Sequence, residues 1–139
     1  MAYYQSYRGG NKYGNKNRVY NGVSYDSILE ASKAQELDLR LKAKDIKGWK
    51  RQVKIEINFV KNKNKKWELT NTPTSELVNQ KVEYRHFRNY FMDFVIENND
   101  GSLEYNEQKG MELEIWRMKF FLTEMMFDNH PTIYLKVEK

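Results

Sequence analysis

Three residues with the chemistry of a hydrolytic site lie on either side of one turn. Asp93 stands inside the apolar run 90–96, and the triplet Glu107-Gln108-Lys109 follows beyond the turn. A carboxylate that leaves water is costly unless it is paired or metal-bound, and two adjacent carboxylates repel unless a divalent cation lies between them. Oxygen-rich sites with few protein ligands suit Mg²⁺, which also accepts substrate phosphate as a ligand. With a lysine to orient water or stabilise charge, the set has the outline of a phosphodiester-hydrolysis site.

Whether these residues meet depends on the turn at 98–101, Asn-Asn-Asp-Gly. A two-residue Asp-Gly loop would place Asp93 and Glu107 on opposite faces of the hairpin. A three-residue loop with glycine in the left-handed conformation would pair the residues just outside the loop. Directly paired residues of an antiparallel ladder point to one face, so this loop would put Glu107 opposite Asp93, with Lys109 on the same face. The sequence allows both loops.

Each of these residues also has an ordinary structural explanation. A lone aspartate in a strand often faces solvent at a sheet edge, and the acid-x-lysine triplet is common. Glu30 is a further acidic candidate, but Ser27-Ile28-Leu29-Glu30 fits a capping box in which Glu30 folds back onto the Ser27 backbone. That role does not exclude a place beside a metal, because the start of the helix can face the sheet. His86 and His130 lack HNH-type spacing, which argues against a histidine-metal nuclease.

The elements that must position these residues follow from apolar spacing and turn signals. The patterns predict a flexible arm at 1–17, a hairpin at 18–25, a helix at 27–47 ending near Gly48, a strand at 52–60, a lysine-rich turn, a strand at 67–70, an irregular segment at 71–80, one or two strands at 82–97, a strand at 103–109, a helix at 112–127 and a strand at 132–137. No repeat or linker divides residues 18–139, so we expect one mixed α/β domain there.

Positive charge is concentrated in two segments of the chain, whose formal net charge is +5. One is the arm with the residue after it, which contains no acid and interleaves its cations with tyrosines. The other is the run 61–66. Basic patches interleaved with aromatic residues suit phosphate backbones and unstacked bases, although a solvated tail and a charged turn have the same composition. We expect DNA contacts from Arg8, Lys12, Lys16, Arg18, Lys61, Lys63, Lys65 and Lys66.

Composition excludes several other classes of site. Cysteine is absent, which excludes disulfides, zinc-thiolate centres and cysteine nucleophiles and favours a reducing compartment, the cytoplasm. No apolar run reaches the roughly eighteen residues of a membrane span, and the first residues lack the apolar segment of a signal peptide.

The order of these residues resembles the PD-(D/E)XK nuclease superfamily, with a glutamate on the first helix, an aspartate in a strand and Glu-x-Lys in the next strand. More closely, the chain resembles a bacteriophage family labelled as a domain of unknown function, over about residues 12 to 135. The matching segments are Lys12-Tyr13-Gly14-Asn15-Lys16, Tyr25-Asp26-Ser27-Ile28-Leu29-Glu30-Ala31, Gln52-Val53-Lys54-Ile55-Glu56, Met92-Asp93-Phe94-Val95, Glu107-Gln108-Lys109-Gly110 and Trp116-Arg117-Met118-Lys119.

The resemblance implies a restriction-endonuclease-like core, a mixed sheet flanked by helices, and Mg²⁺-dependent DNA cleavage in which Mn²⁺ substitutes. Asp93 and Glu107 would bind the metal with the Gln108 carbonyl, and Lys109 would position the attacking water. Glu30 would bind a second metal or a water on the first. Two further site candidates complete the set, a phosphate-neutralising Lys119 and Gln52.

Two departures from that family stand out. Asn106 replaces an acid that the family often has before the x-Lys. The interval from Glu30 to Asp93 is also long and contains the lysine run 61–66, which suggests an insertion that touches substrate.

The nearest functional analogy is the Holliday-junction resolvases of bacteriophages, which act as homodimers in the host cytoplasm. A nicking or restriction-like endonuclease without junction preference is an alternative, and so is a non-catalytic DNA-binding protein of the same fold. The intact acids and Lys109 argue against the latter. Two symmetric cuts require two sites, which a twofold dimer supplies. The last helix has more apolar residues than one face can bury, so we expect a dimer contact among Trp116, Phe121, Met125, Met126 and Phe127.

Overall fold

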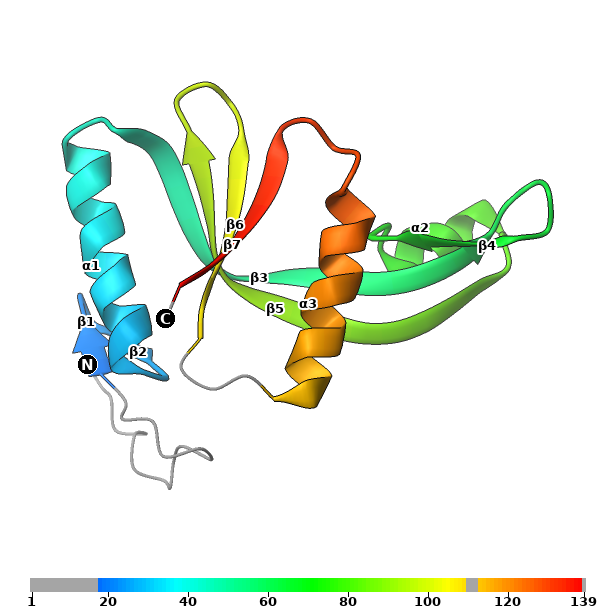
Figure 1. The fold of residues 1–139 in the computed structure, drawn as a ribbon, viewed down its shortest axis with the longest axis horizontal. Helices are drawn as coiled ribbons and strands as arrows, with labels where there is room; N and C mark the ends of the chain where they lie inside the picture. Colours follow the sequence, from blue (N-terminus) through cyan, green and yellow to red (C-terminus); the bar gives the residue numbers. More distant parts are fainter. Residues whose placement is uncertain (1–17, 110–112, 139) are drawn as a thin grey trace.

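A computed structural model describes residues 18–109 and 113–138, and these form a mixed α/β fold (Figure 1). The elements are β1 (Arg18–Tyr20), β2 (Val23–Tyr25), α1 (Ile28–Lys42), β3 (Ile46–Lys61), β4 (Trp67–Thr70), α2 (Thr74–Gln80), β5 (Tyr84–Asn98), β6 (Leu103–Gln108), α3 (Glu114–Phe127) and β7 (Ile133–Glu138). The predicted arm at 1–17, with Arg8, Lys12 and Lys16, lies outside the described residues.

The hairpin β1–β2 and the start of α1 form as the sequence predicts. Asn21 and Gly22 have φ angles of 53° and 78°, the positive values that a tight two-residue hairpin turn requires. Ser27 caps α1, because its Oγ accepts the N–H of Glu30 at 3.1 Å. Only this half of the predicted capping box forms, since no described residue donates a hydrogen bond to the Glu30 carboxylate.

The predicted end of the first helix was wrong. α1 ends at Lys42, and Gly48 lies inside β3. Lys44 adopts a φ of 62°, and its N–H and that of the next residue bond back to carbonyls of the last helical turn. The helix therefore ends at a lysine in the left-handed conformation, at a position where glycine is the usual residue.

The main sheet has the order β4-β3-β5-β6-β7, and only β6 and β7 run parallel. α3 is the crossover between those two strands, because parallel neighbours cannot be joined by a tight hairpin. β3 and β5 pair over most of their length and extend past β6 and β7 as a long ribbon, with β4 at its far end (Figure 1). The predicted segment 82–97 is therefore one strand, and the predicted strand 52–60 begins earlier, at Ile46.

β3 and β5 bend midway along their length (Figure 1), and Gln52, in the middle of β3, has a φ of 50°. A left-handed non-glycine residue inside a strand is strained, and such strain is concentrated at functional sites. The core divides at this bend into two clusters. One lies where α1 packs, around Leu37 and Phe94, and the other where α3 packs, around Met92 and Trp116. The bend is level with Asp93, because the flanking residues of β3 pair with those on either side of Asp93.

The helices depart from prediction in two further ways. Segment 71–80 was predicted to be irregular, but it contains α2, which follows Pro73, a residue whose missing N–H costs nothing at a helix start. Trp116 and Phe127 were expected at a dimer contact, but they are only 7% and 6% exposed and belong to the core on the α3 side. No helix in the described ranges is long and apolar enough to cross a membrane.

Candidate active site

The turn between β5 and β6 has the three-residue form. The N–H of Asn98 donates to the carbonyl of Ser102 at 2.9 Å, and the N–H of Gly101 donates to the carbonyl of Asn98 at 2.9 Å. Gly101 has a φ of 89°, which suits glycine at this position. Of the two loops that the sequence allowed, the structure therefore has the one that gathers the acids.

Asp93 and Glu107 face each other where β5 and β6 separate. The paired ladder ends at Phe94 and Asn106. Beyond it, side chains replace the backbone bonds: Glu107 Oε1 accepts the Asp93 N–H at 3.2 Å, and Asp93 Oδ2 accepts the Gln108 N–H at 2.9 Å. Each carboxylate is thus held by the opposite strand, and the two lie together at the opening.

An aromatic pair adjoins Glu107. Trp116 Nε1, at the start of α3, lies 2.9 Å from Glu107 Oε2 and 2.9 Å from the hydroxyl of Tyr90. Lys109 Nζ lies 5.1 Å from the centre of the Trp116 ring, and Lys119 Nζ lies 5.5 Å from that of Tyr90. Both predicted lysines therefore lie beside the aromatic pair, of which the sequence had suggested only a dimer contact for Trp116 and nothing for Tyr90.

The three candidate acids perturb one another electrostatically. Burial, with repulsion from Glu107 and Glu30, raises the pKa of Asp93 to about 8. Burial, with repulsion from Asp26 and Glu107, raises the pKa of Glu30 to about 7. Burial also raises the pKa of Glu107, although the hydrogen bonds that its carboxylate accepts act to lower that pKa. Lys109 opposes all three shifts. Glu30, from α1, is therefore part of the same electrostatic cluster.

This donor set fits a hard divalent cation. Ionised carboxylates that are buried and mutually repelling are stabilised by a cation between them. No three Asp, Glu, His or Cys side chains within 18–109 and 113–138 are placed to hold a metal ion together. The chain would therefore supply Asp93, Glu107 and the Gln108 carbonyl, and leave the other positions to water and phosphate, as Mg²⁺ prefers. Glu30 is close enough to repel the pair without joining it as a third ligand.

Gln52, a weaker candidate from the sequence, lies directly beside the acids. Its Nε2 is 3.4 Å from Asp93 Oδ1, a long hydrogen bond. Because its strained backbone bends β3 at this level, Gln52 both shapes the site and contacts it.

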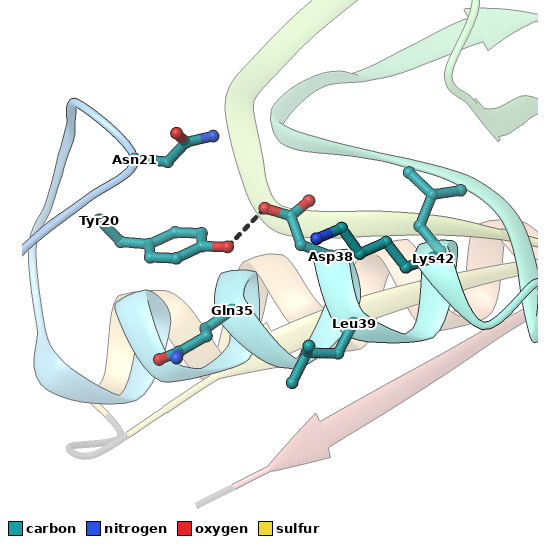
Figure 2. A pocket seen from close by; sticks show the side chains of 7 residues that line it. Tyr20, Asn21, Gln35, Asp38, Leu39 and Lys42 are labelled. Atoms are coloured by element: carbon teal, nitrogen blue, oxygen red, sulfur yellow. Dashed lines mark hydrogen bonds between the residues drawn. The ribbon is translucent and has the colours of Figure 1, made fainter.

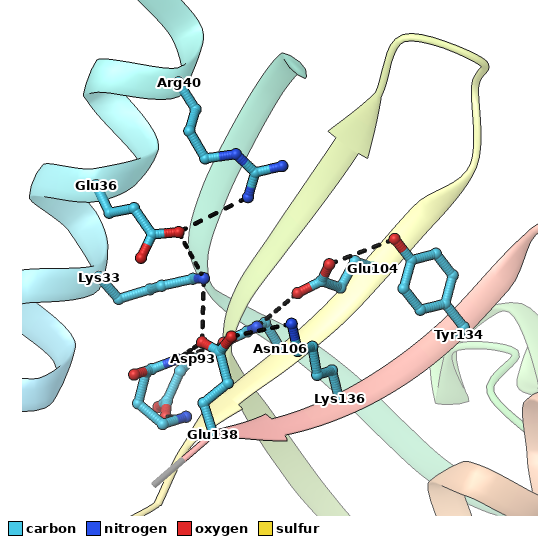
Figure 3. Close-up of polar contacts among 10 residues, drawn as sticks. Lys33, Glu36, Arg40, Asp93, Glu104, Asn106, Tyr134, Lys136 and Glu138 are labelled. Atoms are coloured by element: carbon cyan, nitrogen blue, oxygen red, sulfur yellow. Dashed lines mark hydrogen bonds and ion pairs between the residues drawn. The ribbon is translucent and has the colours of Figure 1, made fainter. Parts of the chain in front are cut away.

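A polar network connects the site to α1 and the last strand (Figure 3). Lys33 Nζ lies 3.0 Å from Glu138 Oε1 and 3.1 Å from Glu36 Oε2, although the Lys33 side chain is only 4% exposed. Gln108 Nε2 also donates to Glu138. Burial alone would raise the pKa of Glu138, but hydrogen bonds from Gln108, Lys33 and Lys136 lower it to about 2. The network holds the side chain of the residue whose backbone N–H binds Asp93.

Asn106 lies on the other face of β6 from the candidate acids. It is fully buried, and its Nδ2 donates to Glu104 Oε2 at 2.6 Å. Successive residues of a strand point to opposite faces, so an acid at this position could not join Asp93 and Glu107. The departure at Asn106 therefore removes no ligand from the pair.

The lysine run lies far from the acids, at what we call the ribbon tip (residues 58–70 and 84–88). Lys61 Nζ and Arg85 Cζ lie 5.2 Å and 4.9 Å from the ring centre of Trp67. Val60 pairs with Tyr84, nine residues from Asp93, which is about 30 Å along the strand. The ribbon tip carries six Lys and Arg residues and one carboxylate, and its exposed cations include Lys63, Lys65 and Lys66.

A separate pocket of about 530 Å³ lies between the hairpin β1–β2 and α1 (Figure 2). Asp38 is the one acid among its lining residues, and both of its oxygens are occupied. Oδ2 accepts the Tyr20 hydroxyl at 2.7 Å and Oδ1 accepts Trp49 Nε1 at 3.1 Å. None of the predicted site residues lines this pocket, so it is not part of the candidate active site.

Comparison of this chain with protein-family models, curated proteins and solved structures found no match. The candidate site is therefore inferred from its geometry. Of the predicted residues, the fold gathers Glu30, Gln52, Asp93, Glu107, Gln108, Lys109 and Lys119 around one place. Arg18, at the exposed start of β1, and the lysine run have no contact with the acids among the described residues.

Proposed function

We propose that this chain is a metal-dependent endonuclease that hydrolyses phosphodiester bonds in DNA, on a restriction-endonuclease-like core of PD-(D/E)XK type. The supporting observation is the meeting of Asp93 and Glu107 at the open end of the β5–β6 ladder, with Lys109 beside them. Buried acids with raised pKa values and a lysine partner are typical of catalytic sites.

Each residue has a definite task in this proposal. Asp93, Glu107 and the Gln108 carbonyl would hold Mg²⁺ or Mn²⁺. When bound, the metal would supply Lewis-acid stabilisation of charge on the phosphate. The Lys109 ammonium orients the attacking water and stabilises the charge that develops on phosphate oxygen. Glu30, with a pKa of about 7 and no hydrogen bond to its carboxylate from the described residues, can accept a proton from water at neutral pH.

Positive groups near the site suit a phosphate backbone. The first turns of α1 and α3 lie toward the same end of the molecule as the end of β6, at the bottom of Figure 1, so the positive ends of both helix dipoles lie toward that end. Lys119 adds a cation one aromatic ring away from Glu107. At the ribbon tip, six Lys and Arg residues face one carboxylate, and of these cations Lys61 lies 3.8 Å from Glu83, just outside the tip. The excess of positive charge favours contacts with more distant phosphates.

The central test is Asp93→Asn. We expect plasmid nicking with Mg²⁺ or Mn²⁺ to disappear, while DNA affinity in EDTA or Ca²⁺ stays near that of the wild type. Asp100→Asn is the matched control, because Asp100 is an exposed acid in the turn of the same hairpin. Cleavage that survives Asp93→Asn would refute the assignment.

The substrate we favour is branched DNA cut by a homodimer, by analogy with junction resolvases. α3 leaves an exposed apolar stripe at helical spacing, made of Ile115, Met118, Phe121 and Met125. A twofold contact through this stripe would place two sites on one junction. Light scattering at micromolar concentration should give about twice the chain mass. Equal cutting of a linear duplex and a four-way junction, or a strict monomer on junction DNA, would favour the nicking endonuclease instead.

A further inference from the structure

Arg51 carries a guanidinium group without an acceptor, one residue from the bend in β3. Its Cζ lies 4.5 Å from the ring centre of Tyr25, so the ring holds the cation in place. Its Nε is buried and has no hydrogen-bond partner. Among the residues that the structure describes, none gives this guanidinium a hydrogen bond or an ion pair.

Lys33, a buried cation near the same site, is paired with acids on both sides, unlike Arg51. Lys33 lies between two carboxylates, at 3.0 Å and 3.1 Å. A guanidinium offers five N–H donors, and partly buried donors without acceptors are rare in folded proteins. Within 18–109 and 113–138, Arg51 Nε is the one side-chain nitrogen or oxygen that is both buried and without a hydrogen bond. The two outer nitrogens of Arg51 also lack a hydrogen bond, so they must be accessible to solvent. They are therefore open to an acceptor from outside the chain.

An acceptor bound to Arg51 would lie near the candidate acids, as the neighbours of Arg51 indicate. It follows Lys50 on β3 and pairs with Phe94, the residue after Asp93. The next residue, Gln52, reaches Asp93 Oδ1. The carboxylate of Glu30 is close enough for the charge of Arg51 to act on it, yet the two form no ion pair. The free donors thus lie on the α1 side of the sheet, near Glu30, the acid that α1 contributes to the cluster.

We propose that Arg51 binds a phosphate of the DNA strand that the Asp93–Glu107 site engages, with the Tyr25 ring fixing its orientation. A planar fork of donors matches two phosphate oxygens, and stacking on a ring reduces the freedom that binding would otherwise remove. This inference rests on the proposed function, because it requires a phosphodiester at the acids. Arg51 is a substrate-binding residue in this arrangement, and its role depends on geometry as well as charge.

The competing explanation is structural. Arg51 could serve only to offset the charge of Glu30 and to pack on Tyr25. Replacement would then lower stability and change the titration of Glu30, but it would leave DNA affinity and its salt dependence unchanged.

The experiment measures affinity for a four-way junction and for a linear duplex of the same sequence in EDTA, over a series of salt concentrations. Arg51→Ala should weaken binding by about 10-fold or more, the scale of one lost charged hydrogen-bond pair. The slope of log K against log salt should shrink by about 0.9, the expected change for one phosphate contact. Arg40→Ala is the matched control, because Arg40 lies on α1 with Glu36 at 3.8 Å.

Two variants keep the test valid if alanine destabilises the fold. Arg51→Lys retains charge but loses the fork, so it should keep the salt slope and still lose affinity. Tyr25→Leu removes the ring that orients the guanidinium, so it should keep the salt slope and also lose affinity. Wild-type affinity and salt slope in both Arg51 variants would overturn the proposal. Because binding is measured without metal, a DNA-binding defect in an inactive protein would support the phosphate site while refuting the nuclease.

Discussion

The bend in the sheet and the ribbon tip are the two charged regions of this molecule, and they are built in opposite ways. At the bend, three acids are largely buried, and their pKa values rise because burial and mutual repulsion disfavour the charged form. At the ribbon tip, six cations are spread over two strand ends and a turn, mostly exposed, with two of them over the ring of Trp67.

The difference concerns what each region can do. Desolvated charges interact strongly over short distances, so the bend can stabilise charge on a reacting group. Exposed cations in water are screened within about 10 Å at ordinary salt, so the ribbon tip can attract and position a polyanion but not alter its chemistry. A variant at the bend should therefore change a rate, and a variant at the ribbon tip should change an affinity and its salt dependence.

The largest effect of the four predictions below is expected at Lys109. Lys109→Ala should lower the single-turnover rate by about 10² or more, the lower end for a positioned catalytic group, with little change in DNA affinity. Lys47→Ala is the control, because Lys47 is an exposed strand lysine whose nearest carboxylate, Glu97, is 3.9 Å away. Rapid-quench measurements at saturating protein provide the rate. An unchanged rate would make Lys109 a surface lysine that merely lies over Trp116.

The ribbon tip should give the converse result. Replacing Lys61, Lys63, Lys65 and Lys66 together by alanine should weaken DNA binding by about 10-fold or more and reduce the salt slope by about two or more. The rate at saturating protein should survive, since these residues lie about 30 Å along the strand from Asp93. Fluorescence anisotropy in EDTA measures the affinity. A lost rate at saturation would mean that the two regions are not separate, and an unchanged slope would make the run a solvated turn.

The sequence predicted the existence of most elements because their signals are local. Alternation marked the strands, and the turn at 98–101 marked the hairpin. Whether Asp93 lies opposite Glu107 depends on the length of the loop, and the sequence allows two lengths. It could not decide between them, because both loops need a glycine and Gly101 serves in either. The structure decided it through the hydrogen bonds of Asn98.

Other features could not be predicted because they depend on contacts between distant segments. Gln52 adopts a left-handed conformation that no neighbouring residue signals. Tyr90 had no assigned role and Trp116 was expected at a dimer contact, because only tertiary packing brings the Trp116 indole to Glu107. The unpartnered guanidinium of Arg51 is likewise invisible in a sequence, since the missing acceptor is a property of the fold.

A third variant tests whether the face of β6 matters more than its composition. Asn106→Asp places an acid next to Glu107 in sequence, but on the opposite face and beside Glu104. Activity should not rise. The free energy of unfolding should fall by about 3 kcal/mol, the low end for an uncompensated buried charge. This corresponds to a melting temperature lower by about 10 °C or more. Glu97→Gln is the control, because Glu97 is a partly exposed residue on the neighbouring strand, and this variant should change the melting temperature little. Increased cleavage would show that position 106 can reach the metal.

The smallest effect concerns pH and the metal-free protein. Asp93 has a folded-state pKa of about 8 and Glu30 of about 7, both above the ordinary values of 3.8 and 4.5. Between the ordinary and the raised values the folded state binds more protons than the unfolded state, so stability falls as pH rises and levels off above about pH 8. In EDTA, the melting temperature should therefore drop between pH 5 and pH 8, by several degrees for each pH unit over which the folded state holds one extra proton. Asp93→Asn should flatten the drop, and Mg²⁺ should reverse it at pH 8 by compensating the ionised acids. Glu138, whose pKa is lowered to about 2, acts in a separate window and loses its contribution only in acid. If the wild type and Asp93→Asn have parallel melting curves from pH 5 to pH 8, the acids at the bend are not coupled in the way that their burial and spacing indicate.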